Sequence, residues 1–446
     1  MDRTTMTGVI QTGDRPILFS AITDKFEFSF LTDSVYEFGN NTCSAVLSSK
    51  DGFIYGKTHD NYSIAIYTGS PSFEIYGSRN LITSAFVKSS SNLTDTSIAE
   101  FQGIQFCGGT LNKLFHANGI KFDWEDRKII VSANDDSKEY TISTDDNDMK
   151  LIVRSMIKEE RGVHRNAIVN ENVELTLEFS SPQPLSAFFT HYDRMIDLIS
   201  FMTFRENVGF DSICLMNPDP QYHYLSKIAD VQVRNENRKT EKDGIFSITF
   251  EDLDAVLPAL VKLFYDCRDK SQSISLGYYR TNDDDHIMTN EKIRAICTAL
   301  ECELNYISDL NQEENRELDE LKEVVRETVK KYRKDHVQLS NDTYNTIFSS
   351  IGYWSFPLAE KLCALYKKYF REMLLLNQSE IVIDEDAIRS FVKYRNDITH
   401  GRHRTLDIAV AYTAFCLGGL VYCCILDRVG LDRQKIYNLC SLKILS

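Results

Sequence analysis

The sequence predicts an α+β protein in which a β-rich N-terminal domain, a sandwich or barrel, precedes an all-α helical bundle. Short segments of alternating apolar and polar residues, separated by Gly, Asp, Asn and Ser, fill residues 1 to about 181. Beyond residue 285, apolar residues recur instead at three- and four-residue steps, which is the period of a helix. A chain of 446 residues is long enough for two or three domains.

The first domain, residues 1–181, is predicted from its strands. Phe26, Phe28 and Phe30 alternate with polar residues, as expected for a strand with one buried face. Comparable runs occupy residues 63–67, 72–76, 81–87, 128–131 and 173–179. This part of the sequence contains no phosphate-binding loop, nucleophile motif or metal-ligand cluster. Cys107-Gly108-Gly109 favours a turn or bulge.

A mixed α/β region follows over residues 182–284. Apolar residues at helical spacing predict a helix over residues 184–204 and another over 250–265, the latter beginning in an acidic turn. A strand pair is expected at residues 212–216 and 228–233. His191 and His223 have no companions at metal-ligand spacing, so we interpret both as structural. The short, acidic stretch 280–288 marks the boundary with the next domain.

Five helices are expected in the third domain, residues 285–446, which suits a bundle. Thr289 or Asn290 can cap the first one. The charged segment 313–336 predicts a solvated helix, and segments 356–376, 384–400 and 407–426 predict the others. In the charged helix, five apolar residues at helical spacing are expected to face inward, namely Leu318, Leu321, Val325, Val329 and Tyr332.

The last predicted helix raises the question of a membrane. Residues 408–426 carry no charge over nineteen residues, which is close to the length of a membrane span. Thr413, Tyr412, Tyr422 and the pair Gly418-Gly419 dilute this hydrophobicity. A helix buried on all sides within a bundle has the same composition, so we expect a core helix and no membrane association.

Composition favours a cytoplasmic protein. The eleven cysteines include no Cys-x-x-Cys pair, so buried free thiols are expected rather than disulfides or zinc ligands. Residues 1–5 do not begin a secretory signal pattern. We expect no cofactor and no bound metal. The net charge is −15, of which residues 1–284 contribute −13 and residues 285–446 only −2. The near-neutral C-terminal part argues for a local RNA-binding cleft rather than a broad basic surface.

The candidate site is the pair Arg395 and His400, in the segment Phe391-Val392-Lys393-Tyr394-Arg395-Asn396-Asp397-Ile398-Thr399-His400-Gly401. Arg395 lies on the apolar face of the predicted helix, where a charged residue needs a reason. Gly401 can take the left-handed conformation that ends a helix after His400. The guanidinium can hold an RNA phosphate, and an imidazole can accept or return a proton at the reacting oxygens. Asn396 can bond the phosphate or orient the imidazole.

The spacing alone is weak support, because about one Arg-x4-6-His match is expected by chance in a chain of this composition. Arg280 and His286 form such a match, but three consecutive aspartates stand between them. These carboxylates would repel a phosphate, and no apolar period predicts a helix there. Around Arg395, by contrast, Lys393, Arg402, His403 and Arg404 add basic residues. Lys393, Arg402 and Arg404 are candidate RNA contacts. His403 is a candidate second base, although its place in a basic linker favours a surface role.

Arg395, Asn396 and His400, late in a helical domain and followed by one apolar helix, resemble the Arg-x4-6-His motif of the HEPN superfamily of metal-independent endoribonucleases. The resemblance implies that an acidic residue on the first helix supports the site, for which Glu301 and Glu303 are candidates, although an exposed carboxylate is the simpler interpretation of each. It also implies a homodimer or higher even oligomer, because one motif supplies a single histidine, and the motif helix with the last helix offers a two-fold interface.

The N-terminal segment is similar in strand and glycine order to the first domain of ApeA-like HEPN proteins, from Gly8-Val9-Ile10 through Gly56-Lys57-Thr58 to Ile64-Ala65-Ile66-Tyr67. Those proteins act in bacterial anti-phage defence by abortive infection. The resemblance implies a recognition or regulatory domain, a phage-derived trigger and an RNA substrate, with transfer RNA among the candidates. The alternative is a non-catalytic RNA-binding, sensor or oligomerisation protein in which Arg395 and His400 are structural.

Overall fold

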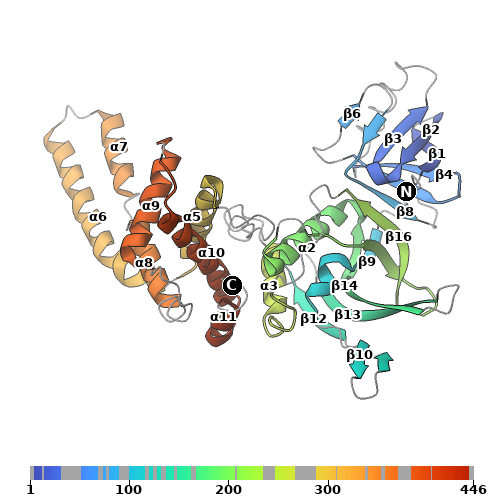
Figure 1. The fold of residues 1–446 in the computed structure, drawn as a ribbon. Coiled ribbons are helices and arrows are strands. Elements are labelled where there is room, and N and C mark those ends of the chain that lie inside the picture. The colour runs from blue at the N-terminus through green and yellow to red at the C-terminus, as the bar shows by residue number, and fades with distance from the viewer. Residues whose placement is uncertain are drawn as a thin grey trace. The chain divides into compact units, whose positions relative to one another are not determined.

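The computed structural model divides the chain into two compact units, Met1–Asp266 and Cys267–Ser446. The structure describes residues 5–12, 15–31, 52–68, 74–76, 80–89, 100–115, 120–123, 128–131, 137–144, 148–161, 167–205, 208–222, 224–234, 247–266, 288–307, 309–336, 340–352, 357–369, 383–402 and 404–440. Figure 1 shows strands throughout the first unit and helices throughout the second, which confirms the α+β class. The predicted boundaries after residues 181 and 284 stay predictions.

The first unit is built on one large antiparallel sheet. Its described strands are β1 (Thr5–Thr12), β2 (Arg15–Ile22), β3 (Glu27–Leu31), β4 (Phe53–Thr58), β5 (Ser63–Tyr67), β6 (Glu74–Tyr76), β7 (Asn80–Ile82), β8 (Ala85–Ser89), β9 (Glu100–Cys107), β12 (Ser137–Ser143), β13 (Asp148–Arg161), β14 (Ala167–Pro184), β15 (Ser212–Pro218) and β16 (Leu225–Val233). They are hydrogen-bonded in the order β12-β13-β14-β9-β15-β16-β8-β5-β4-β1-β2-β3-β7-β6. A separate hairpin joins β10 (Ile120–Asp123) and β11 (Lys128–Val131).

Residues 212–233 complete this sheet from its middle. The hairpin β15–β16 pairs with β9 on one side and with β8 on the other. The strands predicted at residues 63–67 and 128–131 have the predicted bounds, and the pair predicted at 212–216 and 228–233 is present and extends further. Strand alternation therefore predicted the elements well, whereas it did not reveal that the middle region shares one sheet with the first domain's strands.

A cluster of buried apolar side chains lies on the strands that come first in the chain. Phe28 contacts Phe19 and Phe86, with ring centroids 5.8 and 5.7 Å apart. Gly8 and Gly56 lie on the paired strands β1 and β4. A Cβ atom on Gly8 would lie 2.2 Å from the Lys57 carbonyl oxygen, so the close approach of these strands requires glycine.

Two helices accompany the sheet among the described residues of the first unit. The segment predicted as a helix over 184–204 contains a 3-10 turn, η3 (Leu185–Ala187), and α2 (Phe188–Thr203). The prediction of a helix from residue 250 was wrong at its start, because residues 250–256 form turns and α3 spans Leu257–Asp266. Pro258 lacks a backbone N–H and is favoured in a first helical turn, so the helix begins there and the acidic residues precede it.

The second unit is a helical bundle. Its described helices are α5 (Asn290–Leu304), α6 (Asp309–Asp335), α7 (Asn341–Gly352), α8 (Leu358–Tyr369), α9 (Glu385–Thr399), α10 (Ile408–Arg428) and α11 (Arg433–Leu439). The five predicted helices are present. α7 and α11 were missed, because each is short and α7 is largely polar. Thr289 is the residue that caps α5, since its hydroxyl accepts a hydrogen bond from the Lys292 N–H.

Helix α10 is the centre of the bundle. It is long and apolar enough to cross a membrane, yet most of its apolar window is buried among α5, α8, α9 and α11. Its C-terminal half is buried without interruption from Cys416 to Leu426. This burial is what the sequence predicts for a core helix. The two-fold interface expected from the motif helix with this last helix stays a prediction.

The cysteines follow the expected pattern. The described ones are free thiols, and all but Cys302 are buried. Cys423 on α10 and Cys440 after α11 bring their Sγ atoms to 2.9 Å, where both are fully buried and serve to pack α11 on α10. Burial raises the pKa of Cys424 well above its ordinary value, so this thiol stays protonated and behaves as a small apolar side chain.

Candidate active site at the end of helix α9

Helix α9 carries the predicted motif, and its sequence specifies both its start and its buried face. The Asp384 carboxylate accepts a hydrogen bond from the Ala387 N–H at 2.8 Å, which caps the helix. Ile388, Phe391 and Ile398 point into the bundle and are buried. The helix is therefore held by its apolar face, and its motif residues are placed by that packing.

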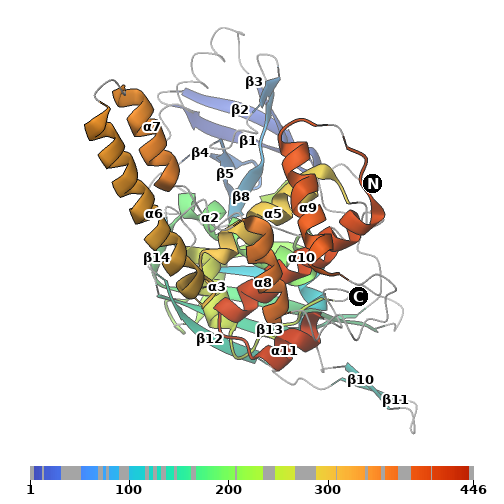
Figure 2. The same ribbon diagram turned by 90° about the vertical axis from the view of Figure 1, so that its left-hand side faces the viewer.

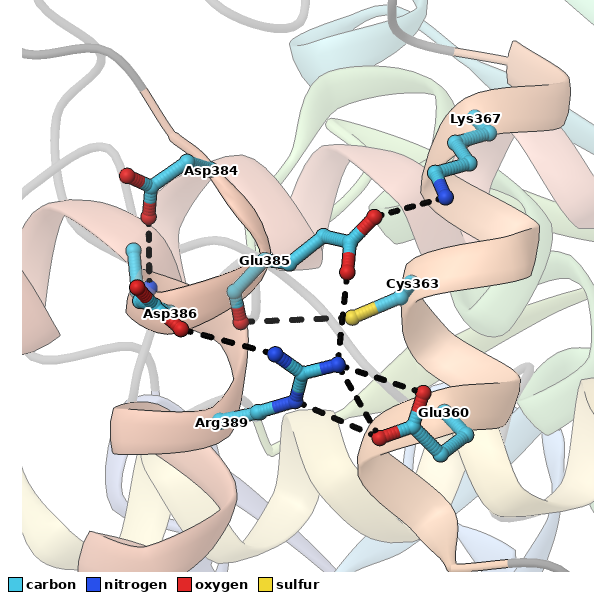
Figure 3. Close-up of polar contacts among 8 residues, drawn as sticks. Glu360, Cys363, Lys367, Asp384, Glu385, Asp386 and Arg389 are labelled. Atoms are coloured by element: carbon cyan, nitrogen blue, oxygen red, sulfur yellow. Dashed lines mark hydrogen bonds and ion pairs between the residues drawn. The ribbon is translucent and has the colours of Figure 1, made fainter.

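Ion pairs tie the first turns of α9 to α8 (Figure 3). The Arg389 guanidinium contacts Glu360 on α8 through its Nε atom at 3.2 Å, and also reaches Glu385 and Asp386 on its own helix. Glu385 in turn pairs with Lys367 on α8 at 2.6 Å. Arg389 and Glu360 are half exposed, so these pairs contribute little to stability. Their shared role is to fix the register of α9 against α8.

The other end of α9 closes at the glycine that the sequence indicates. Gly401 has φ of +72°, and its N–H donates to the Ile398 carbonyl while the Arg402 N–H donates to that of Asp397. This pair of hydrogen bonds is a Schellman motif. His400 is the C-cap residue, with ψ of 13° instead of a helical value, and it is exposed. The histidine is therefore released from the regular helix, as the five-residue separation from Arg395 requires.

A second arginine supports this helix end, and the sequence analysis missed it. Arg294 on α5 donates from Nη2 to the Ile398 carbonyl at 2.6 Å. Ile398 is one of the last helical residues, whose carbonyls have no partner within the helix. Arg294 lies two turns before Glu301 on the same face of α5, which is the only signal in the sequence that the two act together.

A carboxylate on α5 explains why the charged residue Arg395 lies on the apolar face of α9. Its Nη2 atom lies 3.0 and 3.1 Å from the two carboxylate oxygens of Glu301, and its side chain is 22% exposed. The Asn396 Oδ1 atom accepts from Arg395 Nη1 at 3.2 Å. Nearby, burial raises the pKa of the Cys297 thiol to about 12, an effect that Arg395 opposes, so Cys297 is a protonated, apolar neighbour.

The two candidate acidic residues on α5, Glu301 and Glu303, have different partners. Glu301 contacts the motif arginine, whereas Glu303 is 1% exposed and pairs with Arg428 of α10 at 3.1 Å. The interpretation of Glu303 as an exposed carboxylate was therefore wrong. An acid two residues further along a helix faces a different side, and here that side meets the end of α10. The Arg428 guanidinium also covers the Tyr306 ring at 4.3 Å.

The basic residues after the motif are held to α9. Arg402 and Arg404 each pair with the Asp397 carboxylate, at 3.2 and 3.1 Å, and Asp397 is only 14% exposed. Both guanidiniums remain accessible, since the side chains of Arg402 and Arg404 are 75% and 44% exposed. Lys393 is exposed on α9. Asp397 is a second residue that the sequence analysis did not single out.

Some predicted residues lie outside the described part of the chain. They are His403, the candidate supporting base, together with Arg280, His286, His223 and the boundary stretch up to residue 287. His191 is described and is buried against Phe179, and burial lowers its pKa to about 4. Within the described residues, no group of three or more His, Cys, Asp or Glu side chains is close enough to hold a metal ion.

The end of α9 thus combines groups that can act on a phosphodiester. It has an arginine aimed by a carboxylate, an exposed imidazole at a helix end, and a surplus of positive charge. Four basic residues, Arg294, Arg395, Arg402 and Arg404, stand against Glu301 and Asp397. This surplus offsets the negative end of the helix dipole, which would otherwise disfavour an anion there.

Comparison with known proteins bears on the first unit. No curated protein and no solved structure matches the chain at a significant level. The family model described as ApeA N-terminal domain 1 matches residues 29–262, just over half of the 446 residues. The matched region ends within α3, next to the end of the first compact unit. The chain therefore belongs to the ApeA N-terminal domain 1 family, which supports an ApeA-like anti-phage defence protein.

Proposed function

We propose that this protein is a metal-independent endoribonuclease of the HEPN type, acting in anti-phage defence by abortive infection. The observation that carries the proposal is the α9 end, where Glu301 on α5 holds the Arg395 guanidinium and the exposed His400, five residues further along, caps the same helix. The family of the N-terminal unit supports the defence context. The Arg-x4-6-His spacing alone would not support this proposal.

In this mechanism the RNA supplies its own nucleophile. His400 takes the proton from a 2′-hydroxyl, whose oxygen attacks the adjacent phosphorus, and the bond to the 5′-oxygen breaks. That oxygen leaves with a proton returned by an imidazolium, and the products are a 2′,3′-cyclic phosphate and a 5′-hydroxyl. Arg395 stabilises the negative charge that develops on the phosphate oxygens. Glu301 and Asn396 keep the guanidinium in position.

The RNA contacts are proposed from charge, and the oligomeric state from the number of histidines that the reaction uses. Lys393, Arg402 and Arg404 bind the RNA backbone beside the site, as exposed cations next to a phosphate-binding centre would. One site has one described histidine, whereas this reaction uses a base and an acid, so the working form is a homodimer or a higher even oligomer. The protein acts in the cytoplasm on cellular RNA, for which transfer RNA is one candidate, and it responds to a phage-derived trigger.

The experiment is RNA cleavage by purified full-length protein in EDTA, with and without a phage lysate as the source of a trigger. Wild type is compared with Arg395→Ala and His400→Ala, and the product ends are analysed. We expect cyclic or 3′-phosphate ends, and rates reduced at least 100-fold in both variants with the circular dichroism spectrum unchanged. Wild type that cuts nothing under either condition, or cleavage that requires a divalent metal, contradicts the proposal.

A second candidate is a non-catalytic RNA-binding or sensor protein. The observation that favours it is the same ion pair, because an arginine already satisfied by Glu301 needs no ligand. RNA that binds without being cut, with equal affinity for wild type and His400→Ala, would support this reading. Loss of cleavage in His400→Ala with RNA affinity retained would favour the nuclease.

A further inference from the structure

One arginine at the end of α9, Arg294 of α5, has no acidic partner. The two carboxylates at this end are already engaged, because Glu301 pairs with Arg395 and Asp397 pairs with two arginines of the following loop. Within the part of the chain that the structure describes, no carboxylate forms an ion pair with Arg294. The positive charge of this guanidinium is therefore not offset by a described acidic side chain.

The guanidinium of Arg294 is nevertheless held in one place. Its Nη2 atom donates to the Ile398 carbonyl oxygen at 2.6 Å, a charge-assisted hydrogen bond. A carbonyl group at the C-terminal end of a helix carries only a partial negative charge, so this bond fixes the guanidinium without neutralising it. The side chain is exposed, and its other N–H groups have no acceptor among the described residues. Arginine carries five N–H donors, so four remain available to a ligand.

The packing around Arg294 fixes its position before any ligand binds. Helices α5 and α9 contact each other and lie side by side in both ribbon views (Figures 1 and 2). One turn before Arg294, the Asn290 Oδ1 atom lies 3.0 Å from the Tyr394 hydroxyl, which lies 3.4 Å from the Arg404 carbonyl oxygen. Tyr394 is 2% exposed, so this buried hydroxyl ties the start of α5 to the loop after α9. A donor that is already in position loses little entropy when it binds.

A fixed guanidinium with a whole charge and spare N–H donors is suited to a phosphate group. Arg294 and Glu301, the partner of Arg395, lie two turns apart on one face of α5, a rise of about 10 Å. The two arginines therefore meet the line between α5 and α9 at separate points. An RNA strand lying along this line brings one phosphate to Arg395 and a flanking phosphate to Arg294.

We propose that Arg294 binds an RNA backbone phosphate that flanks the one reacting at Arg395, and thereby sets the path of the strand between α5 and α9. The inference rests on the proposed function, since it takes RNA as the ligand of this site. It adds a substrate-binding residue on a helix other than the motif helix. Because Arg294 holds a phosphate that does not react, its charge contributes to RNA affinity and not to the chemical step.

The first test measures RNA binding by the full-length protein without cleavage. The probe is a single-stranded RNA oligonucleotide of mixed sequence in which every 2′-oxygen is methylated, so that no 2′-hydroxyl can attack. Arg294→Gln removes the charge, and we expect it to raise the Kd about tenfold and to lower the slope of log Kd against log salt concentration by about one. Arg294→Lys keeps the charge and is expected to keep the slope.

Arg333 is the matched control for the binding test. It lies on α6, which packs on α7 and α8, and its Nη2 atom bonds the Asn341 Oδ1 atom at 2.6 Å. Like Arg294, it has no carboxylate partner among the described residues. Arg333→Gln thus removes the same charge from another helix, and it is expected to leave the Kd within about twofold and the salt slope unchanged. Equal effects of the two glutamine variants, or wild type that binds no RNA, overturn the inference.

Cleavage kinetics separate substrate binding from a purely structural role. Arg294→Gln is expected to raise KM about tenfold with kcat within about threefold, whereas Arg395→Ala lowers kcat. A lower kcat with KM and Kd unchanged would make Arg294 only a support of the helix end, which contradicts the inference. The two proposals can fail separately. Binding that depends on Arg294 without any cleavage leaves this inference standing and removes the nuclease, and cleavage that is unaffected by Arg294→Gln does the reverse.

Discussion

The two ends of helix α9 present opposite charge environments. At its start, Arg389 and Lys367 stand among the carboxylates of Glu360, Asp384, Glu385 and Asp386, so acids outnumber bases. At its end, four arginines stand against the carboxylates of Glu301 and Asp397. Both ends hold an arginine by a neighbouring helix, yet only one has positive charge to spare for an anionic substrate. An ion-paired arginine is thus a site candidate only when its surroundings leave a net positive charge.

The sharpest way to break this comparison is to remove each arginine in turn. Arg395→Ala is expected to lower RNA cleavage at least 100-fold, because the charge that stabilises the reacting phosphate is gone. Arg389→Ala, on the same helix, is expected to leave the rate within about twofold, because it acts only on surface ion pairs. Single-turnover rates on one RNA measure both. Equal losses in the two variants would mean that the arginines serve only to hold the helix.

Replacing the carboxylate partner of each arginine makes the same comparison, with a smaller expected effect. Glu301→Gln is expected to lower the cleavage rate about tenfold, because an amide holds the guanidinium less firmly than a carboxylate does. Its stability is expected to change by less than about 1 kcal/mol, since the pair is partly exposed. Glu360→Gln is the control and is expected to change neither rate nor substrate affinity. Faster cleavage in Glu301→Gln would instead identify Glu301 as a competitor of the phosphate.

Gly401 and Gly430 have equivalent geometry, so substituting each in turn separates the effect of backbone strain on stability from an effect on cleavage. Gly401 and Gly430 follow α9 and α10 with φ of +72° and +87°, and an added Cβ would meet nothing within 4 Å at either. Ala at each is expected to cost about 1 kcal/mol of unfolding free energy, from the left-handed backbone alone. Only Gly401→Ala should also reduce cleavage, because it displaces His400. Urea denaturation and cleavage rates test this, and a parallel loss in Gly430→Ala would refute it.

The smallest expected effect is a change in the pKa of one carboxyl group, that of Glu385. The hydrogen bond and charge of Lys367 hold the Glu385 pKa below its ordinary value of 4.5. A carboxyl with a lowered pKa stabilises the fold above pH 4.5, and this contribution is lost as the pH falls through its folded-state pKa. Lys367→Ala is therefore expected to raise the Glu385 pKa toward 4.5, as a carboxyl titration by NMR would measure. An unchanged pKa would mean that Arg389 alone accounts for the shift.

The sequence predicted most of the site because its signals are local. Helix period placed Arg395 on the inner face of α9, and Gly401 ended the helix with the predicted conformation. Glu301 was named as one of two candidates, but period could not separate it from Glu303, because the choice depends on which neighbouring helix each carboxylate meets. Arg294 was missed because its partner is a backbone carbonyl on another helix, and Asp397 because its partners lie in the loop that follows α9.

The fold was predicted to the level that local pattern allows. Strands and helices were found with bounds close to those observed, and the long apolar segment was correctly predicted to be a core helix. The order of strands in the sheet was not predictable, because pairing between residues more than a hundred apart leaves no short-range signal. The burial of Leu321 and Tyr332 on α6 was wrongly predicted for a similar reason: the two side chains are 51% and 53% exposed, since a helical stripe shows that a face is apolar without showing what covers it.

The strand order of the first unit has a consequence for synthesis. β8 and β9 are close in sequence but are separated in the sheet by β15 and β16. The ribosome completes β9 at Cys107 and begins β15 at Ser212, about a hundred residues later. At roughly 5 to 20 residues per second, this interval lasts on the order of 5 to 20 s. For that time the nascent chain presents two unpaired strand edges, and chaperone binding there would protect it from aggregation until the closing hairpin emerges.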